Sequence, residues 1–245
     1  MRFGAWLVVA GLGYAVVQPA YAQYDAPAVV KAVNRAELSS ELAGRVTSLP
    51  FRMGDTFEKG DVLVGLDCRL YQAQSKKVAA ELKAAAVKLK SASELRELRA
   101  IGELDVALAE SEHAQSEAEL AISRINTQRC EVRAPWDGRV VELMVSRFEN
   151  VTQQQPLIGI VDDSELEAEV VIPAAWLTWL EPGLAAELHI DGLGVTAQAE
   201  VSAISPAIDA VSQTVLLRAL IAPNDALVPG ITGTASFKPN PSQGQ

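Results

Sequence analysis

The sequence contains two copies of one short β-type pattern, separated by residues 68–137. A shift of 94 positions aligns Gly44–Leu49 with Gly138–Leu143 and Leu63–Leu66 with Leu157–Ile160, and six of the 24 positions in 44–67 are identical in 138–161. Each copy consists of short β-type runs that are broken by turn residues. Internal repetition constrains architecture more than any single motif does. The copies therefore predict a small pseudo-symmetric β sandwich, and the alternative is chance similarity between two β meanders.

The sequence between the copies has helical character. It has no Gly or Pro from Leu70 to Arg99, and a second such stretch runs from Glu103 to Gln128 after a short break. Apolar and small residues recur in alternating steps of three and four, which is a heptad pattern. The predicted seam residues are Val78, Leu82, Ala85, Leu89 and Ala92 in the first stretch, and Leu104, Leu108, Ser111, Gln115, Ala118, Ile122 and Ile125 in the second.

Two helices joined by a tight turn predict an antiparallel coiled-coil hairpin over residues 68–130. About 29 residues at about 1.5 Å each give an arm of about 40 Å. Because the seam has small and polar residues at several positions, we expect a lateral neighbour to complete its burial. The alternative is an ordinary two-helix excursion on the surface.

The chain has two cysteines, Cys68 and Cys130, and they stand where the helical insertion leaves and rejoins the two copies. If the copies pair as one domain, the two residues are neighbours at the base of the hairpin. An oxidising compartment permits a disulfide there. We predict a bond between Cys68 and Cys130.

The first 22 residues have the features of a secretory signal peptide. Arg2 precedes an apolar run of 13 residues, Ala5–Val17, and Ala20-Tyr21-Ala22 is a small-x-small triplet. The run is shorter than the about 20 residues that span a bilayer. We predict cleavage before Gln23 and a periplasmic mature protein. The alternative is a retained N-terminal anchor.

Composition and charge disfavour several classes of function. Twenty-one Lys and Arg against 31 Asp and Glu give a net charge of −10, which repels the phosphate backbone of nucleic acids. Two Cys and two His do not have the spacing of a zinc site, and His113, His189, Met53 and Met144 are too scattered for a soft-metal site. The sequence has no phosphate-binding loop and no nucleophile with a base and an orienting group. We predict a protein that is not an enzyme and that uses no cofactor or metal.

The motifs of the two copies, together with the helical insertion, resemble the periplasmic adaptor, or membrane fusion protein, family of tripartite efflux pumps, which includes HlyD-like and RND-type adaptors. The most specific stretch is Ala134-Pro135-Trp136-Asp137-Gly138, which closes the helical insertion. The residues that carry the lipoyl-like motif are Gly44, Gly54, Gly60, Asp67, Ala134, Pro135, Asp137 and Gly138.

The resemblance implies a mainly β fold with a long α-helical hairpin. A split lipoyl-like sandwich would comprise residues 38–67 and 131–162, with the hairpin 68–130 inserted in it. A β-barrel domain would follow at 163–238, and 239–245 would be a disordered tail. The residues themselves support the barrel, because Leu166–Ile172 and Ala185–Ile190 alternate like strands, and Trp176–Leu180 predicts a short helix.

The resemblance also implies partners. Such adaptors form rings, often six-membered, between an inner-membrane transporter and a TolC-type outer-membrane channel. The implied channel contacts at the hairpin tip are Arg96, Leu98, Arg99, Ile101, Gly102 and Leu104. The chain departs from the family at Gly102, where Ser is common, and at Phe148-Glu149-Asn150, where a Gly-containing turn is usual. Only 15 residues follow Gly230, so we expect the membrane-proximal domain of larger members to be absent or residual.

Three other functions are compatible with parts of the sequence. A short arm and a cleavable signal favour an RND-type transporter as the partner, and an ABC-type exporter or type I secretion system is the alternative. A soluble periplasmic binding or structural module is an alternative of a different class. A biotin or lipoate carrier would display a Lys at the turn between the copies, but Lys76 and Lys77 fall within the first predicted helix.

Overall fold

The computed structural model describes residues 24–223 and 226–239. They form two compact units, which we describe separately. Of these residues, one unit contains 30–167, 223 and 226–230. The other contains 24–29, 168–222 and 231–239. The predicted signal peptide and most of the predicted tail lie outside the described residues.

The first unit contains a sandwich of two four-stranded sheets, ordered β2-β9-β7-β4 and β6-β5-β3-β8. The strands are β2 (Arg35–Ser39), β3 (Gly44–Ser48), β4 (Thr56–Phe57), β5 (Val62–Leu66), β6 (Glu131–Arg133), β7 (Gly138–Leu143), β8 (Asn150–Val151) and β9 (Pro156–Val161). The first strand begins at Arg35, three residues before the predicted start of the domain.

The two copies fold against each other, as the sequence predicts. Under a shift of 94 positions, β3, β4 and β5 correspond to β7, β8 and β9. The same shift makes the second half of β2 correspond to β6. Each copy gives its two-residue strand to the sheet of the other: Thr56 in β4 pairs with Arg139, and Val151 in β8 pairs with Gly44. The sandwich is therefore one body that neither copy could complete alone.

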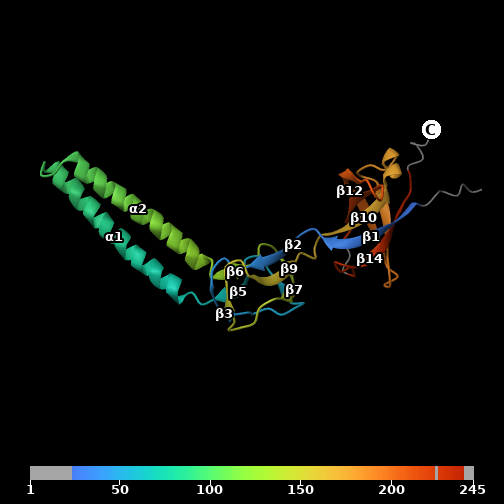
Figure 1. The fold of residues 1–245 in the computed structure, drawn as a ribbon, viewed down its shortest axis with the longest axis horizontal. Coiled ribbons are helices and arrows are strands. Elements are labelled where there is room, and N and C mark those ends of the chain that lie inside the picture. The colour runs from blue at the N-terminus through green and yellow to red at the C-terminus, as the bar shows by residue number, and fades with distance from the viewer. Residues whose placement is uncertain (1–23, 224–225, 240–245) are drawn as a thin grey trace, which may run out of the picture. The chain divides into compact units, whose positions relative to one another are not determined.

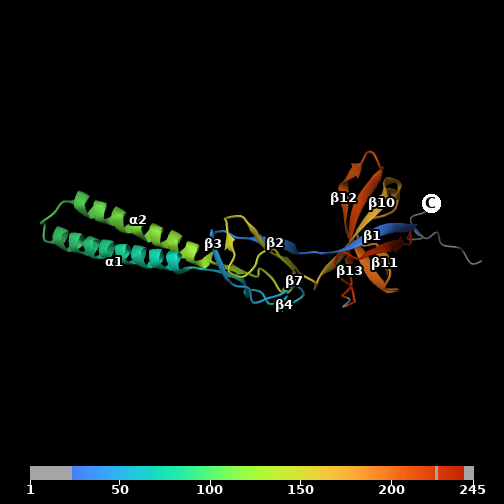
Figure 2. The same ribbon diagram turned by 60° about the horizontal axis from the view of Figure 1, so that its bottom comes forward.

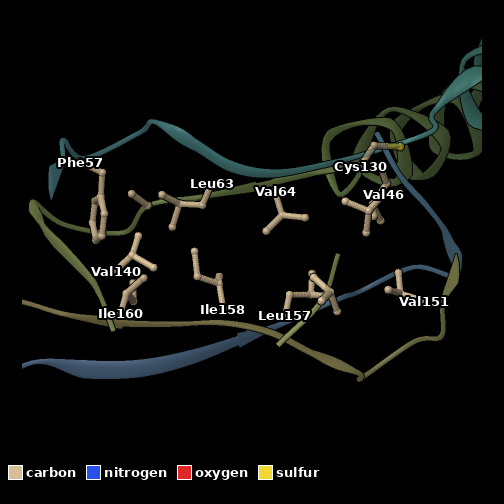
Figure 3. Packing of buried hydrophobic residues seen from close by; sticks show 13 residues of the cluster. Val46, Phe57, Leu63, Val64, Cys130, Val140, Val151, Leu157, Ile158 and Ile160 are labelled. Carbon is tan, nitrogen blue, oxygen red and sulfur yellow. The ribbon is translucent and has the colours of Figure 1, made fainter. Parts of the chain in front are cut away.

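The sandwich core is mostly aliphatic and lies between the two sheets (Figure 3). Phe57 lies at one end of the core, and Cys130 lies at the other end, beside the helices. The fully buried members are Val46, Leu63, Val64, Leu157, Ile158 and Ile160. Gly138 has no room for a side chain, because a Cβ there would lie 2.1 Å from the carbonyl oxygen of Val161.

Two helices leave this end of the sandwich and pack side by side (Figures 1 and 2). They are α1 (Arg69–Glu97) and α2 (Glu103–Gln128), and residues 98–102 join them. In α1 the buried residues are Val78, Ala85 and Ala92, which lie in the predicted seam.

The predicted seam of α2 is wrong. The buried residues of α2 are Val106, Ala109, Leu120 and Ser123, whereas every residue of the predicted seam from Leu104 to Ile125 is exposed. The small residues Ala109 and Ser123 face α1, which allows the two backbones to approach closely. The larger apolar side chains lie on the opposite side of α2.

The second unit is a closed barrel with the strand order β1-β10-β13-β12-β11-β14 (Figure 2). The strands are β1 (Tyr24–Ala32), β10 (Leu166–Pro173), β11 (Ala185–Ile190), β12 (Thr196–Asp209), β13 (Thr214–Ile221) and β14 (Thr232–Phe237). β10 and β11 match the predicted strands. The sequence reading missed β1, which pairs with β14 from Tyr24 opposite Phe237 to Val29 opposite Thr232.

The predicted short helix of the barrel lies two residues earlier than expected and is a 3₁₀ helix, η1 (Ala174–Thr178). Trp176 packs edge-to-face against Tyr24, with 5.3 Å between the ring centroids, and Trp179 lies 4.9 Å from the same ring. Aromatic contacts therefore fix η1 to the N-terminal strand of the barrel. Within the described part of the chain, neither α-helix combines the length and the apolar character needed to cross a membrane.

Candidate functional site

The outward face of α2 carries an apolar stripe. Leu104, Leu108, Ile122 and Ile125 are 72%, 60%, 60% and 46% exposed. With Ser111, Gln115 and Ala118, they repeat in steps of four and three along the helix. At about 100° per residue, this stripe lies on the opposite side of α2 from Val106, Ala109 and Leu120. A helix with two apolar faces can pack against two partners, and α1 covers only one of these faces.

The outward face of α1 has a second regular stripe. Ala73, Ala80 and Val87 recur every seven residues, and Lys76, Lys83 and Lys90 alternate with them. All six residues are exposed. This face is shallow because its apolar members are small, and it is strongly basic. We call the two surfaces the α2 stripe (Leu104, Leu108, Ser111, Gln115, Ala118, Ile122 and Ile125) and the α1 stripe (Ala73, Lys76, Ala80, Lys83, Val87 and Lys90).

The two helices carry opposite net charges. α1 has seven Lys and Arg against three Glu, a net charge of +4. α2 has six Asp and Glu against one Arg, a net charge of −5. Within the hairpin this asymmetry forms an ion pair between Lys88 and Glu112. The two helices are thus opposite in net charge, and the apolar members of their outward faces differ in size, small on α1 and large on α2.

The tip of the hairpin contains all six predicted contact residues. Arg99 adopts a left-handed conformation with φ 57°, and the N–H groups of Arg99 and Ala100 donate to the carbonyls of Arg96 and Leu95. These bonds satisfy two carbonyls at the end of α1, which is a common way for a helix to terminate. At the start of α2 the carboxylate of Asp105 accepts the N–H of Gly102 at 3.1 Å.

The side chains at the tip differ in their exposure. Leu98 and Leu104 are 77% and 72% exposed, and Arg96 and Arg99 are exposed as well. Ile101 is half-buried and packs against Ala92, Val106 and Ala109, so it closes the hairpin from inside. Gly102 is exposed as well, so of the six predicted contact residues only Ile101 is partly withdrawn from the surface that a partner could reach.

The base of the hairpin is fixed by a disulfide and by charge. The structure joins Cys68 to Cys130 in a disulfide bond, as the sequence predicts. Beside it, the carboxylate of Asp67 accepts hydrogen bonds from the guanidinium of Arg69, the closest at 2.6 Å, and Arg45 lies 3.7 Å away. The hydrogen bonds from the Arg69 side chain and backbone lower the pKa of Asp67 from 3.8 to about 2.

The other lipoyl-like motif residues lie in turns or at close contacts between the copies. Asp137 accepts the N–H of Lys59 at 2.6 Å, and buried Ala134 exchanges backbone hydrogen bonds with Gly60 and Asp61. Pro135 is exposed. Gly44 begins β3, where a Cβ would make only ordinary contacts. These positions hold the two copies together and have no reactive arrangement.

The acids and histidines singled out by the sequence are not grouped. Asp209 accepts hydrogen bonds from the backbone N–H groups of Val211 and Ser212, and Asp162 accepts from Ser164 and Asn34. His189 contacts Thr196, whereas His113 lies on α2. In the described ranges, no three His, Cys, Asp or Glu side chains gather as metal ligands would.

The chain is a modular protein in which one unit is a sandwich that carries a helical hairpin and the other is a six-stranded barrel. The family model of the CzcB-like barrel-sandwich hybrid domain matches residues 34–162, more than half of the chain, and the CusB-like β-barrel domain model matches residues 166–241. The chain belongs to the membrane fusion protein, or periplasmic adaptor, family of efflux pumps.

Individual relatives are distant. Nodulation protein NolF of Rhizobium meliloti is 25% identical over an alignment of 198 residues, which covers 75% of this chain and 54% of NolF. An uncharacterized protein of Haemophilus influenzae is 26% identical over 193 residues, 78% of this chain and 50% of that protein. The chain spans about half the length of these curated relatives.

Solved structures share the fold. A MacA-MexA chimera with the α-hairpin domain of Pseudomonas aeruginosa MexA has a TM-score of 0.79 at 22% identity, and 90% of this chain and 82% of the chimera are covered. A putative efflux transporter of Bacteroides eggerthii has a TM-score of 0.74 at 18% identity, with coverage of 96% and 74%.

The sequence reading missed the α1 stripe and misassigned the α2 stripe. A signal for the first was present, because Lys76, Lys83 and Lys90 recur every seven residues. The opposite net charges of the two helices were a second signal. Either could have indicated that the outer faces, rather than only the tip, are candidate interaction surfaces.

Proposed function

We propose that the chain is a periplasmic adaptor subunit that links an inner-membrane RND-type transporter to a TolC-type outer-membrane channel, exported by its N-terminal signal and acting as a ring of copies. The observation that carries the proposal is the exposed α2 stripe. Four large aliphatic side chains at heptad spacing are an exposed apolar surface that a partner would bury. The proposed adaptor consists of the split sandwich, the hairpin of residues 68–130 and the barrel.

The ring would form by packing the α2 stripe of one copy against the α1 stripe of the next. Such an interface joins two different surfaces, so it can repeat around a closed ring. The negative charge of α2 attracts the positive charge of α1 on the next copy, which favours this arrangement. Repulsion between two α2 helices opposes α2-to-α2 pairing. The family resemblance implies six copies. The tip leucines Leu98 and Leu104 would then form a circle of apolar contacts for the channel.

A charge exchange tests the ring. Lys83→Glu with Lys90→Glu should reduce cross-links between copies in cells and abolish export. Adding Glu110→Lys and Glu117→Lys should restore both, because acids at 83 and 90 of α1 can then pair with lysines at 110 and 117 of α2 on the next copy. Lys59→Glu, on an exposed sandwich turn, is the control and should leave both unchanged. Equal cross-linking in all four proteins would refute packing between these faces.

A photo-crosslinking residue at position 98 tests the partners, with one at position 128 as the control near the hairpin base. The proposal expects an outer-membrane channel bound from position 98 and not from 128. Copurification should yield a transporter without a nucleotide-binding domain. A partner with such a domain would favour the ABC-type or type I alternative. Absence of both kinds of partner would favour a soluble binding or structural module.

A further inference from the structure

The sandwich unit contains a cavity of about 360 Å³ that none of the surfaces described above uses. Its floor is the outer face of the β2-β9-β7 sheet, and its wall is the segment Leu227–Pro229. Gly230, next in the chain, donates its N–H to the carbonyl of Val30 at 2.7 Å, which holds the segment in place. The cavity is therefore a property of one compact unit.

Three residues in register form the floor. Val161 of β9 pairs with Arg35 of β2 on one side and with Arg139 of β7 on the other. Directly paired residues place their side chains on the same face of a sheet. Because Ile160 belongs to the sandwich core, Val161 faces outward, yet it is only 8% exposed. An apolar floor is thus flanked by two guanidinium groups.

The charges of the cavity do not cancel. Nε of Arg139 forms an ion pair with Asp163 at 2.6 Å. Arg35 makes no ion pair with any carboxylate in the described ranges. Asp162 is adjacent in sequence, but it does not line the cavity, and its carboxylate is bonded to Asn34 and Ser164. The lining therefore has two cations and one anion, a net charge of +1.

The remaining walls are apolar. Leu227 is buried, Val141 is half-buried, and Val228 at the mouth is 63% exposed. A mostly apolar concave site with a few convergent polar groups is the usual form of a small-molecule site. Guanidinium groups bind carboxylate, sulfonate and phosphate oxygens through paired N–H donors.

We propose that this cavity binds a small organic anion with an apolar body, whose acidic group contacts Arg35 and whose body lies on Val161 against Leu227 and Val228. The site is independent of the ring interface, because it lies on the sandwich rather than on the hairpin. It gives the protein a ligand-binding function in addition to its proposed assembly role.

Fluorescence titration of the purified chain with anilinonaphthalene sulfonate tests the site, and uncharged phenylnaphthylamine is the comparison probe. We expect one saturable sulfonate site, at least about tenfold weaker binding in Arg35→Gln, and wild-type binding in the control Arg124→Gln on α2. The uncharged probe should bind the wild type at least about tenfold more weakly and should not respond to Arg35→Gln. Equal sulfonate affinity in Arg35→Gln and Arg124→Gln would overturn the proposal.

A second variant keeps the proposal testable if Arg35→Gln does not fold. Val228→Trp changes an exposed position at the mouth and should fill the cavity without disturbing the core. We expect at least about tenfold weaker binding of the sulfonate probe with an unchanged melting temperature. Undiminished binding in a folded Val228→Trp protein would show that the probe binds elsewhere.

Discussion

Gly54 and Phe148 occupy equivalent positions in the two copies, and both adopt a left-handed backbone, with φ 90° and φ 72°. The N–H of Gly54 donates to the carbonyl of Val140 at 2.9 Å, and the N–H of Phe148 donates to the carbonyl of Val46 at 2.8 Å. Val46 and Val140 are themselves related by the shift of 94 positions. Each turn therefore hydrogen-bonds to the opposite copy in the same way, with glycine in one copy and phenylalanine in the other.

This equivalence predicts that Phe148→Gly is about 1 kcal/mol more stable than Phe148→Ala. Both variants lose the contact between the Arg147 guanidinium and the Phe148 ring, 4.9 Å from its centroid. Only alanine keeps a Cβ that disfavours the left-handed conformation. Urea unfolding of the two variants measures the difference. Equal free energies of unfolding would mean that the backbone at Phe148 is not under strain.

The same relationship explains what the sequence could and could not predict in the sandwich. Gly54 and Gly60 mark turns of the first copy visibly, but their equivalents are Phe148 and Gln154, which carry no such signal. Gln154 nevertheless has φ 66° and donates its N–H to Ser40. The repeat predicted that the copies pair, because six identities and the strand pattern remained. The turns of the second copy could not be predicted from the sequence, because hydrogen bonds to the other copy hold their left-handed backbones without glycine.

The hairpin and barrel errors have different physical causes. Heptad spacing predicted two helices, but α2 carries two stripes, and the one with larger side chains was taken as the seam. Close packing of α1 and α2 instead selects small residues such as Ala92 and Ala109. β1 could not be identified because its partner β14 lies about two hundred residues away in sequence.

The seam can be tested by overpacking. Ala109 is 2% exposed and packs with Ala92 and Val106, so Ala109→Leu should destabilise the hairpin by about 1–3 kcal/mol. Ala118→Leu is the matched control, because Ala118 is exposed on the α2 stripe and should shift stability by less than about 0.5 kcal/mol. Thermal melts followed by the helical circular dichroism signal provide the comparison. A larger loss in Ala118→Leu would restore the seam first predicted from the sequence.

Removal of the Cys68–Cys130 disulfide should destabilise the protein without unfolding the sandwich core. The bond closes a loop with a sequence separation of 62, for which the chain-entropy model gives about 4 kcal/mol. The variant with both Cys68→Ser and Cys130→Ser should unfold at lower urea concentration, and a reducing agent should shift the wild type to the same midpoint. The variant itself should not respond to the reducing agent. Two titratable thiols in the untreated wild type would contradict the bond.

Asp67 should give the protein a distinctive response to acid. Hydrogen bonds from Arg69 hold the pKa of Asp67 at about 2, below its ordinary value of 3.8. A carboxylate with a lowered pKa stabilises the folded state fully above its ordinary value, and that stabilisation is lost as the pH falls from about 4 through about 2. Asp67→Asn should therefore have a lower free energy of unfolding than the wild type at pH 6. The two free energies should approach each other near pH 2.

A titration of Asp67 itself tests whether Arg69 is the cause of its lowered pKa. A carboxyl carbon NMR titration should find the Asp67 midpoint near pH 2 in the wild type and closer to 3.8 in Arg69→Gln, because that variant loses the donating guanidinium. Added salt should raise the wild-type midpoint as well, since Arg69 is 82% exposed and its charge is readily screened. A midpoint that stays near pH 2 in Arg69→Gln would assign the low pKa to Arg45 and the backbone instead.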